Sequence, residues 1–550
     1  MNTDTVASSR FTRPFNSPRG SRLAWGVFLV SLTYVCLPFF PLAFSEGDDI
    51  SISLGVYQYE DQCGTPYKLH AQAGLYYLLS LTRSATGVDP QAAFGGWVLV
   101  GYALFVSFSA AFVSRVLKIS FPLCGIALLL FPETYIASYY LNGNMVAAGF
   151  LAVSLWAATC DNRRADVLAG LMFAIAIWIR IDALLLALVY PALLLGPTLR
   201  QAARLLLVAA CTAAALLVLY WLTGTSLEAL RATASHQRAT YADLLRTVQV
   251  YAVFFPTSVL ALLAVGGGVL WRQRPRLVAA CVLAILPIAG AFGSSLTTPK
   301  YLLFGVPLLA LPVGAALVWF IESRSPRAIF LAGACAGLMA HQYLWFMPPM
   351  PATVATADYP RLTDAVAATP LAWMHIKARQ LAWQRTIRRE LQTVVEAAAD
   401  PLIVTHGFES GELAAYELRR QNPDCRLKFE SGEMAANKLR GQYPDFRLKA
   451  STYQGEASGP NDLDPDDQCL RVETYQAPGR PEILLLRFGT HADLNARLRG
   501  HGIADALPGR RALLIELAGA GPLPQEARIL GRRASLRRIE GAVYSAAFVK

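Results

Sequence analysis

The sequence predicts a polytopic α-helical membrane protein of about eleven transmembrane helices, followed by a soluble α/β domain. Two observations support this fold class. Hydrophobic residues make up 54% of the 550 residues, which is more than a soluble protein usually contains. The excess lies within residues 23–346, where apolar runs of membrane-spanning length recur between short polar breaks. Beyond Pro348 the composition is that of an ordinary soluble domain.

The apolar runs define the expected transmembrane helices, because about 20 apolar residues let a helix cross a bilayer. The first run follows four arginines and shows no small-residue cleavage site, so we interpret it as an uncleaved span after a tail, residues 1–22. A polar break at residues 180–182 divides one apolar stretch into a fifth and a sixth span. The alternative is one long tilted span, which would reverse the side of everything after it. The eleven expected spans are 23–44, 93–114, 119–137, 144–160, 165–180, 182–197, 204–223, 249–270, 277–296, 301–321 and 328–346.

The positive charges predict the orientation of these spans. With the N-terminus inside, the tail and the inner loops hold fifteen Lys and Arg residues, and the outer loops hold seven. This asymmetry follows the rule that cytoplasmic loops are enriched in Lys and Arg. It also accounts for the net charge of +11 without nucleic-acid binding. An odd number of spans then places residues 347–550 on the outer side.

Two long outer loops, 45–92 and 224–248, carry most of the polar side chains of the membrane half. The second half of loop 45–92 mixes aromatic, cationic and apolar residues, which predicts a helix lying in the membrane interface. The inner loops are short and merely basic. Functional side chains are therefore expected on the outer face.

The soluble domain, residues 347–550, contains a tandem repeat in which residues 409–429 and 430–450 are identical at 14 of 21 positions. Two copies are too few for a solenoid, so we interpret them as a local duplication inside an α/β domain. A basic helical stretch is expected at 361–399 and a helix near 491–499. Strands are expected at 401–405, 482–488, 512–517 and 542–549.

An acidic group, Glu46, Asp48 and Asp49, follows the first span. Carboxylates in such a position can act as a general base, hold a metal ion or cap a helix. No cofactor is firmly predicted, and a divalent cation at these three residues remains an open alternative. No CxxC pair and no Cys/His spacing typical of zinc sites occurs in the chain, so no metal-ligand set is assigned.

Several cationic and aromatic residues accompany the outer loops and span ends. Lys68 and His70 precede the Gly74-Leu75-Tyr76-Tyr77 segment, and Lys300 and Tyr301 follow Thr298-Pro299. Taken alone, such residues are typical of an interfacial aromatic belt with a snorkelling lysine. Arg180 and Asp182 lie within the apolar half, where ionisable residues are functional candidates. The candidate phosphate-binding residues are Lys68, His70, Arg180, Arg238, Lys300 and Tyr301.

These segments resemble the GT-C superfamily of polyprenyl-phosphate-sugar glycosyltransferases, which includes aminoarabinose transferases and protein O-mannosyltransferases. The resemblance covers about residues 20–346. It rests on Asp48-Asp49, Tyr67 with Leu75-Tyr76-Tyr77, the 142–156 span, Arg180-Ile181-Asp182 and Thr298-Pro299-Lys300-Tyr301-Leu302-Leu303. Aminoarabinose transferases tend to show Lys-Pro-Pro-Leu before the tyrosines, whereas this chain has residues 70–75, HAQAGL.

The resemblance implies an inverting glycosyltransferase that moves a sugar from a polyprenyl-phosphate donor to an envelope lipid, glycan or protein. It implies Asp48 as the catalytic base, with Asp49 as the second choice, and Lys68 and Lys300 near the lipid phosphate. The expected location is the bacterial inner membrane, with the N-terminus cytoplasmic and the C-terminal domain periplasmic. The alternatives are a transporter or flippase of a lipid-linked glycan, and an assembly protein whose soluble domain does the work. We find no internal repeat among the spans that would favour a transporter.

Overall fold

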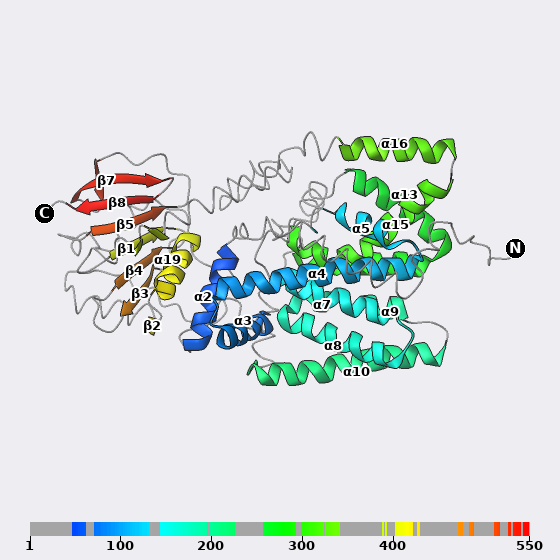
Figure 1. Ribbon diagram of the computed structural model, residues 1–550, viewed down its shortest axis with the longest axis horizontal. Helices are drawn as coiled ribbons and strands as arrows, with labels where there is room; N and C mark the ends of the chain where they lie inside the picture. The colour runs from blue at the N-terminus through cyan, green and yellow to red at the C-terminus, as the bar shows by residue number, and fades with distance from the viewer. Residues whose placement is uncertain are drawn as a thin grey trace. The chain divides into compact units, whose positions relative to one another are not determined.

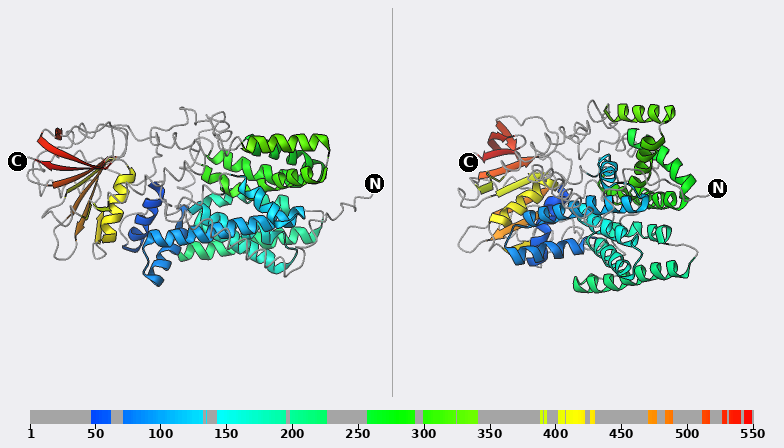
Figure 2. Two further views of the ribbon diagram at one scale, coloured as in Figure 1. Left: turned by 45° about the horizontal axis from the view of Figure 1, so that its top comes forward. Right: turned by 45° about the vertical axis from the view of Figure 1, so that its right-hand side comes forward.

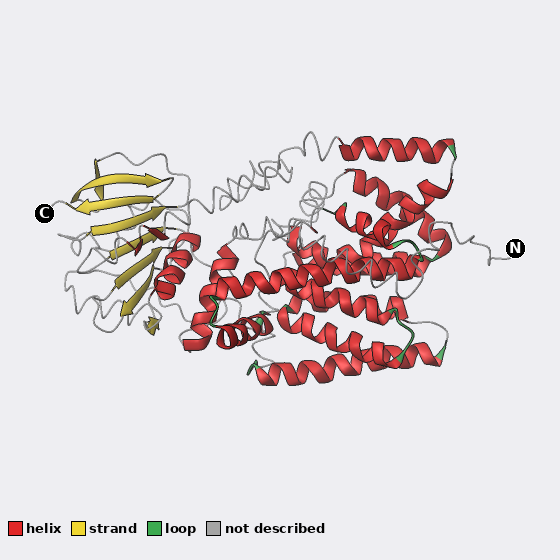
Figure 3. Ribbon diagram, viewed as in Figure 1, coloured by secondary structure: helices red, strands yellow, loops and turns green. Residues whose placement is uncertain are grey.

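The structure of the protein is a computed structural model, and its described residues fall into two compact units. The helical unit comprises Met1–Ala43, His70–Leu78 and Phe94–Met374, and the sheet unit comprises Phe44–Leu69, Leu79–Ala93 and His375–Lys550. Figure 3 distinguishes the helices from the strands. The described residues are 47–61, 71–131, 134, 143–194, 198–225, 257–292, 299–323, 325–340, 388–389, 391–392, 402–406, 408–421, 426–429, 470–476, 483–488, 511–516, 526–529, 532–540 and 543–548.

Three helical segments in the described part of the chain are long and apolar enough to cross a membrane (Figure 1). They are α4 (Pro90–Leu117), α10 (Leu199–Leu222) and the segment Leu302–Ser323, which contains α15 (Val306–Ser323). Their first residues favour helix formation. Asp89 accepts a hydrogen bond from the Gln91 amide at 2.9 Å just before Pro90, and Thr198 accepts one from the Gln201 amide at 3.4 Å. The protein therefore has the apolar, multi-helical character of an integral membrane protein.

Shorter helices complete the helical unit. They are α5 (Phe121–Leu129), α7 (Gly143–Ala158), α8 (Arg163–Ile179), η3 (Ile181–Leu186), α9 (Val189–Leu194), α13 (Thr257–Gln273), α14 (Pro275–Phe292), η5 (Pro299–Gly305) and α16 (Pro326–Ala340). The expected first span, 23–44, lies outside the described residues.

Two expected spans are wrong as single regular helices. The 182–197 run forms the 3₁₀ helix η3 and then the short helix α9. Pro191 accounts for the division, because proline cannot donate to the carbonyl four residues earlier and its ring clashes there. In the 119–137 run, α5 ends at Leu129 and the chain turns at Leu130, shortly before Pro132. The expected break between the fifth and sixth spans is present, since Arg180 is extended between α8 and η3.

Small residues allow the helices of this unit to pack closely. A Cβ atom placed on Gly149 of α7 would lie 2.5 Å from the Gly101 carbonyl oxygen of α4. The α8 and α10 helices meet at Gly170, whose carbonyl accepts a hydrogen bond from the Thr212 hydroxyl at 3.2 Å. Ser154 of α7 donates to the Ala169 carbonyl of α8 at 2.6 Å. Glycine contacts and hydroxyl hydrogen bonds of this kind are typical of helix packing in membranes.

The sheet unit contains eight strands in the order β2-β3-β4-β1-β5-β8-β7-β6. The central strand β1 runs parallel to both β4 and β5, and the other neighbours are antiparallel. The strands are β1 (Leu402–His406), β2 (Arg426–Phe429), β3 (Leu470–Gln476), β4 (Ile483–Phe488), β5 (Arg511–Glu516), β6 (Glu526–Ile529), β7 (Arg532–Glu540) and β8 (Val543–Phe548).

Two helices accompany the sheet within the same unit. The α19 helix (Phe408–Gln421) packs against β1 and β4 and also against α2 (Gly47–Asp61), so that it lies between α2 and the sheet (Figure 2). The first copy of the tandem repeat provides most of α19 and all of β2. The second copy, 430–450, lies outside the described residues, as do the expected helix at 491–499 and most of the 361–399 stretch.

Candidate functional site

The expected site residues fall into three groups in the structure. Asp48 and Asp49 occupy the first turn of α2 in the sheet unit, and their side chains are not described. Arg180, Lys300 and Tyr301 belong to the helical unit. Lys68, His70 and Arg238 lie outside the described residues. The joint action of Asp48 with the cations of the helical unit therefore remains a prediction.

A buried ion pair occupies the break between α8 and η3. The Arg180 guanidinium donates to Asp182 Oδ2 from Nε at 3.0 Å and from Nη2 at 2.5 Å. Both residues are only 4% exposed. The extended backbone of Arg180, with φ −149° and ψ 116°, ends α8 and lets the chain turn into η3. A charged pair is thus enclosed among the apolar helices of the helical unit, where burying charges is costly.

Two buried amide side chains lie in the same region. Gly143, the first residue of α7, lets the Gln72 and Arg180 side chains pack closely against the helix. A Cβ atom at this position would lie 3.1 Å from Gln72 Oε1 and 3.4 Å from Arg180 Cγ. Gln72 Oε1 and both side-chain atoms of the adjacent Asn144 are buried without a hydrogen-bond partner among the described residues. Buried polar atoms are rarely left without a partner, so these atoms mark a candidate polar site.

The same place holds the first turn of α7, whose leading backbone N–H groups have no partner within the helix. A helix N-terminus attracts anions through these groups and through the helix dipole. The Arg180 guanidinium, which is paired with Asp182, lies beside it. The cluster of Gln72, Gly143, Asn144, Arg180 and Asp182, the buried polar cluster hereafter, is suited to an anionic oxygen-rich group.

The η5 helix brings another expected segment to this region. It packs against α7, α14 and η3, and it carries Lys300 and Tyr301 near its start. The backbone of the Lys300 segment therefore lies beside the elements that hold Arg180 and Asp182, although more than 100 positions separate them in the sequence. The side chains of Lys300 and Tyr301 are not described.

Next to the buried polar cluster, aromatic residues of α3 (Ala73–Thr86) and α8 pack against each other. The Tyr77 and Trp178 rings lie 5.5 Å apart between centroids. Gly74 lies against the same indole, since a Cβ atom there would be 2.5 Å from Trp178 Cδ2. The Gly74–Tyr77 segment therefore has a packing role that its sequence pattern left open.

Sequence reasoning missed Gln72 and Asn144, which are neutral and lie in apolar surroundings. A signal existed for each. Gln72 lies two residues after His70, and Asn144 is the first residue of the expected fourth span. A polar amide at a helix start is easily interpreted as a cap, and only its burial without a partner distinguishes it.

In the sheet unit, a second polar group holds α2 against α19. The Tyr416 hydroxyl donates to the Asp89 carboxylate, and the Tyr57 and Tyr416 rings lie 5.9 Å apart. Burial, reinforced by the nearby Asp89 carboxylate, raises the pKa of Tyr57 to about 12. Burial and the same carboxylate raise the pKa of Tyr416 well above its usual value. Both phenols therefore remain protonated throughout the neutral range, and Tyr416 keeps its donor.

Charged side chains extend this contact. Glu417 is fully buried, and its carboxylate accepts hydrogen bonds from Arg388 Nε at 2.5 Å and Arg420 Nε at 2.9 Å. Arg83 forms an ion pair with Glu60, and its guanidinium lies 4.8 Å from the centre of the Tyr57 ring. The helix whose first turn carries Asp48 and Asp49 thus packs against α19 through the Tyr57–Tyr416 ring pair and through Arg419, whose guanidinium lies 5.1 Å from the centre of the Tyr57 ring.

Within the described residues, no group of three or more His, Cys, Asp or Glu side chains could hold a metal ion. Glu46 and the side chains of Asp48 and Asp49 lie outside that set. A cation at these three carboxylates remains an open alternative.

No family model and no curated protein matches the sequence. Solved structures of ArnT from Cupriavidus metallidurans, one in the apo state and one bound to undecaprenyl phosphate, do align with it. Each alignment covers 72% of this chain and 85% of ArnT, at 16% sequence identity and a TM-score of 0.46. ArnT is an aminoarabinose transferase of the GT-C type, the superfamily that the sequence motifs resemble.

Proposed function

We propose that this protein is an inverting glycosyltransferase that uses a polyprenyl-phosphate sugar as its donor. The observation that carries the proposal is the buried polar cluster, in which Arg180 and Asp182 are paired among apolar helices, and in which Gln72 Oε1 and the Asn144 amide have no hydrogen-bond partner among the described residues. Ionisable residues in such surroundings are expensive and are functional candidates by default. The GT-C-like motifs supply the reaction class.

The donor carries a phosphate between its sugar and its lipid, and this chemistry matches the cluster. Arg180, the first turn of α7 and Lys300 would stabilise the negative charge that grows on the phosphate as it leaves. The amides of Gln72 and Asn144 would hydrogen-bond the phosphate or the sugar. The apolar helices around them suit the polyprenyl chain.

Asp48 would act as the general base. The acceptor hydroxyl oxygen forms the new bond to the anomeric carbon, the bond from that carbon to the phosphate oxygen breaks, and the hydroxyl proton moves to the carboxylate. Polyprenyl phosphate leaves with the bonding electron pair, and the anomeric configuration inverts. A single displacement needs no covalent enzyme intermediate.

The sidedness and the acceptor class belong to the same proposal. The reaction would take place on the outer face of the bacterial inner membrane, because Asp48 and Lys300 lie in expected outer segments. The acceptor would be an envelope lipid, glycan or protein.

The test compares Asp48→Asn with Asp49→Asn in transfer from purified polyprenyl-phosphate sugar, in detergent. The amide keeps the size of the carboxylate but cannot accept a proton at neutral pH. We expect Asp48→Asn to lower kcat by about 10²–10⁴ with donor binding retained. Asp49→Asn should leave kcat within a few-fold if that residue only caps α2. Lys300→Ala should weaken donor binding and also lower kcat.

Wild-type turnover in the Asp48→Asn variant would remove its assignment as the base. Full activity in the Asp48→Asn, Asp49→Asn double variant would remove this loop from the chemistry. A wild-type protein that moves the donor lipid between leaflets of a vesicle without transferring its sugar would support the flippase alternative.

A further inference from the structure

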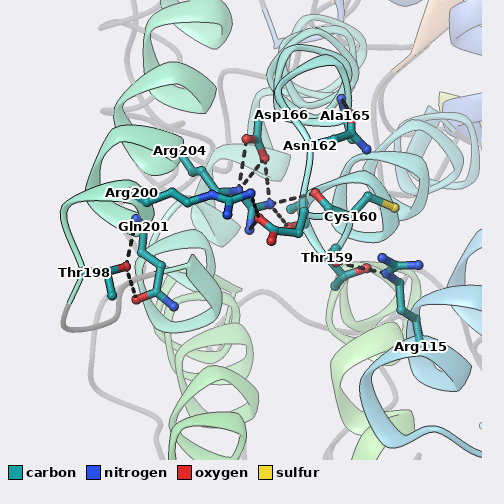
Figure 4. A network of polar contacts seen from close by, with 12 residues as sticks. Arg115, Thr159, Cys160, Asn162, Ala165, Asp166, Thr198, Arg200, Gln201 and Arg204 are labelled. Carbon is teal, nitrogen blue, oxygen red and sulfur yellow. Dashed lines mark hydrogen bonds and ion pairs between the residues drawn. The ribbon is translucent and has the colours of Figure 1, made fainter.

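A second polar region lies in the helical unit, where α4 and α7 end and α8 and α10 begin (Figure 4). Arg204 of α10 donates to both oxygens of the buried Asp166 at 2.8–3.1 Å and to the carbonyls of Ala158 and Cys160. Arg115 of α4 donates to the Thr159 carbonyl at 3.0 Å. This network ties four helix ends together and has no part in the proposed transfer reaction.

The network borders a pocket of about 500 Å³ with four cations in its lining: Arg115, Lys118, Arg204 and Arg274. Asp166 neutralises Arg204. No carboxylate among the described residues forms an ion pair with the other three. A pocket in which three positive charges have no counter-ion among the described residues is suited to an anionic ligand.

Helix capping explains part of this arrangement. Arg274 donates to the Val116 carbonyl at 2.5 Å, as Arg115 does to Thr159, and each contact satisfies an orphan carbonyl near the end of a helix. Each contact occupies one N–H of a guanidinium that has five. Capping therefore accounts for where the arginines lie and leaves most of their donors for a ligand.

Capping does not explain Lys118. This residue follows the last residue of α4 and has a φ of 58°, the only positive φ at a non-glycine residue in the described part of the chain. Glycine is the usual residue at this position, because an L side chain is disfavoured in the left-handed conformation. Within the described residues, the Lys118 side chain makes no hydrogen bond or ion pair, so it does not offset that strain. A strained position that keeps a cation at a pocket points to a function for the cation.

The lining of the pocket also includes the apolar residues Leu193, Leu194 and Leu277. The pocket lies where α4 and α10, two helices of membrane-spanning length, have their ends. Cations together with apolar residues at the end of a transmembrane bundle match a phospholipid, whose phosphate and acyl chains need both.

We propose that this pocket binds the phosphate of an anionic glycerophospholipid, with Lys118 as a principal ligand and Arg115 and Arg274 beside it. The site is separate from the buried polar cluster, since α7 separates the two along its length: the cluster lies at Gly143, and the pocket lies at Ala158 and Thr159.

The test uses the full-length protein and measures binding of phosphatidylglycerol against phosphatidylcholine by native mass spectrometry. Lys118→Gly should weaken phosphatidylglycerol binding about fivefold, the effect of one cation near an anionic headgroup. The same variant should unfold at an equal or higher temperature in lipid-free detergent, because glycine relieves the left-handed strain. Arg164→Gln is the matched control. It removes one exposed positive charge at the same end of the helices, from a residue that does not line the pocket.

Selective loss of phosphatidylglycerol in Lys118→Gly, with Arg164→Gln unchanged, supports the lipid site. Inorganic phosphate and glycerol phosphate form the second arm. If they bind the wild type, and Lys118→Gly weakens them while acyl chains add nothing, the phosphate chemistry holds and its source is a soluble compound. Equal binding by the wild type and Lys118→Gly, or equal losses in Lys118→Gly and Arg164→Gln, would overturn the proposal.

Discussion

At the scale of single residues, a contribution to folding stability does not explain why Arg180 and Asp182 are buried as an ion pair. Two charges are removed from water inside an apolar helical unit, and their mutual attraction only partly offsets that cost. A packed apolar pair of similar volume would often stabilise the fold equally well. Arg180 also lies beside Gly143, near amide atoms that have no partner among the described residues, and ligand binding is therefore the role that we propose for the charges.

Single and double substitutions separate stability from function at this site. Arg180→Met leaves a buried, uncompensated carboxylate, and we expect it to cost about 3–5 kcal/mol of folding free energy. The double variant Arg180→Met, Asp182→Leu should regain most of that loss, because no buried charge remains. Thermal unfolding in detergent measures the stability of both variants, and the transfer assay measures their function.

Neither variant should transfer sugar if Arg180 binds the donor phosphate. A double variant that folds stably and retains wild-type transfer would show that the pair is structural. The sequence marks Arg180 and Asp182 as candidates because charges stand out within an apolar run. It could not identify Gln72 and Asn144, because neutral amides become informative only when their burial and missing partners are known.

At the scale of elements, the tandem repeat divides into one copy that makes buried contacts and one that lacks the residues to make them. In the first copy, Tyr416 and Glu417 contact Asp89 and Arg388. The equivalent positions in the second copy, 21 residues later, are Asn437 and Lys438. The copies therefore differ where the first one binds its neighbours, and we expect only the first to hold α2.

Exchange of one charge tests this division. Glu417→Lys places a buried lysine beside Arg388 and Arg420, so we expect it to release α2 and to lower transfer at least tenfold. Lys438→Glu makes the opposite exchange in the second copy and should leave transfer within twofold. Hydrogen exchange of the α2 peptide, residues 47–61, reports release directly and distinguishes it from global unfolding. Equal effects of the two variants would contradict the assignment of separate roles.

The predictability of the elements depended on how strongly each pattern was expressed. The apolar strands β1, β4, β5 and β8 lie within one residue of the expected positions. The strands β2, β3, β6 and β7 were missed, because charged residues interrupt their apolar pattern, as in Arg532–Glu540. Their pairing with neighbouring strands fixes them, and a single sequence does not display that pairing. Pro191 could have predicted the break within residues 182–197, but the length of the apolar run favoured a single span.

At the scale of the whole molecule, residues expected in one outer loop contribute to two units. Phe44–Leu69 and Leu79–Ala93 belong to the sheet unit, whereas His70–Leu78 belongs to the helical unit. The contact between Tyr416 and Asp89 joins residues 327 positions apart. Local sequence patterns do not indicate such long-range contacts. The sequence therefore predicted the loop but not its contact with α19.

The charge pattern predicts which loops share a side of the membrane, and the structure shows which of these loops lie close together. Arg115, Lys118, Arg204 and Arg274, all expected in inner loops, line one pocket. The segments of Arg180 and Lys300, both expected outside, meet where η3 packs against η5. The charge pattern thus grouped these loops consistently. Which group faces the cytoplasm remains a prediction from the positive-inside rule.

Single-cysteine labelling in intact cells tests the orientation of the whole chain. In a background without the nine native cysteines, we expect Ser235→Cys and Gln392→Cys to react with a membrane-impermeant thiol reagent. Arg163→Cys should react only after permeabilisation, because its loop belongs to the fifteen-charge side. These three positions sample the expected second outer loop, the C-terminal domain and an inner loop.

Labelling of Ser235→Cys without Gln392→Cys would mean that the number of spans between them is wrong. Labelling of Arg163→Cys alone would invert the topology, and the proposed chemistry would then face the cytoplasm, where the phospholipid pocket is now expected.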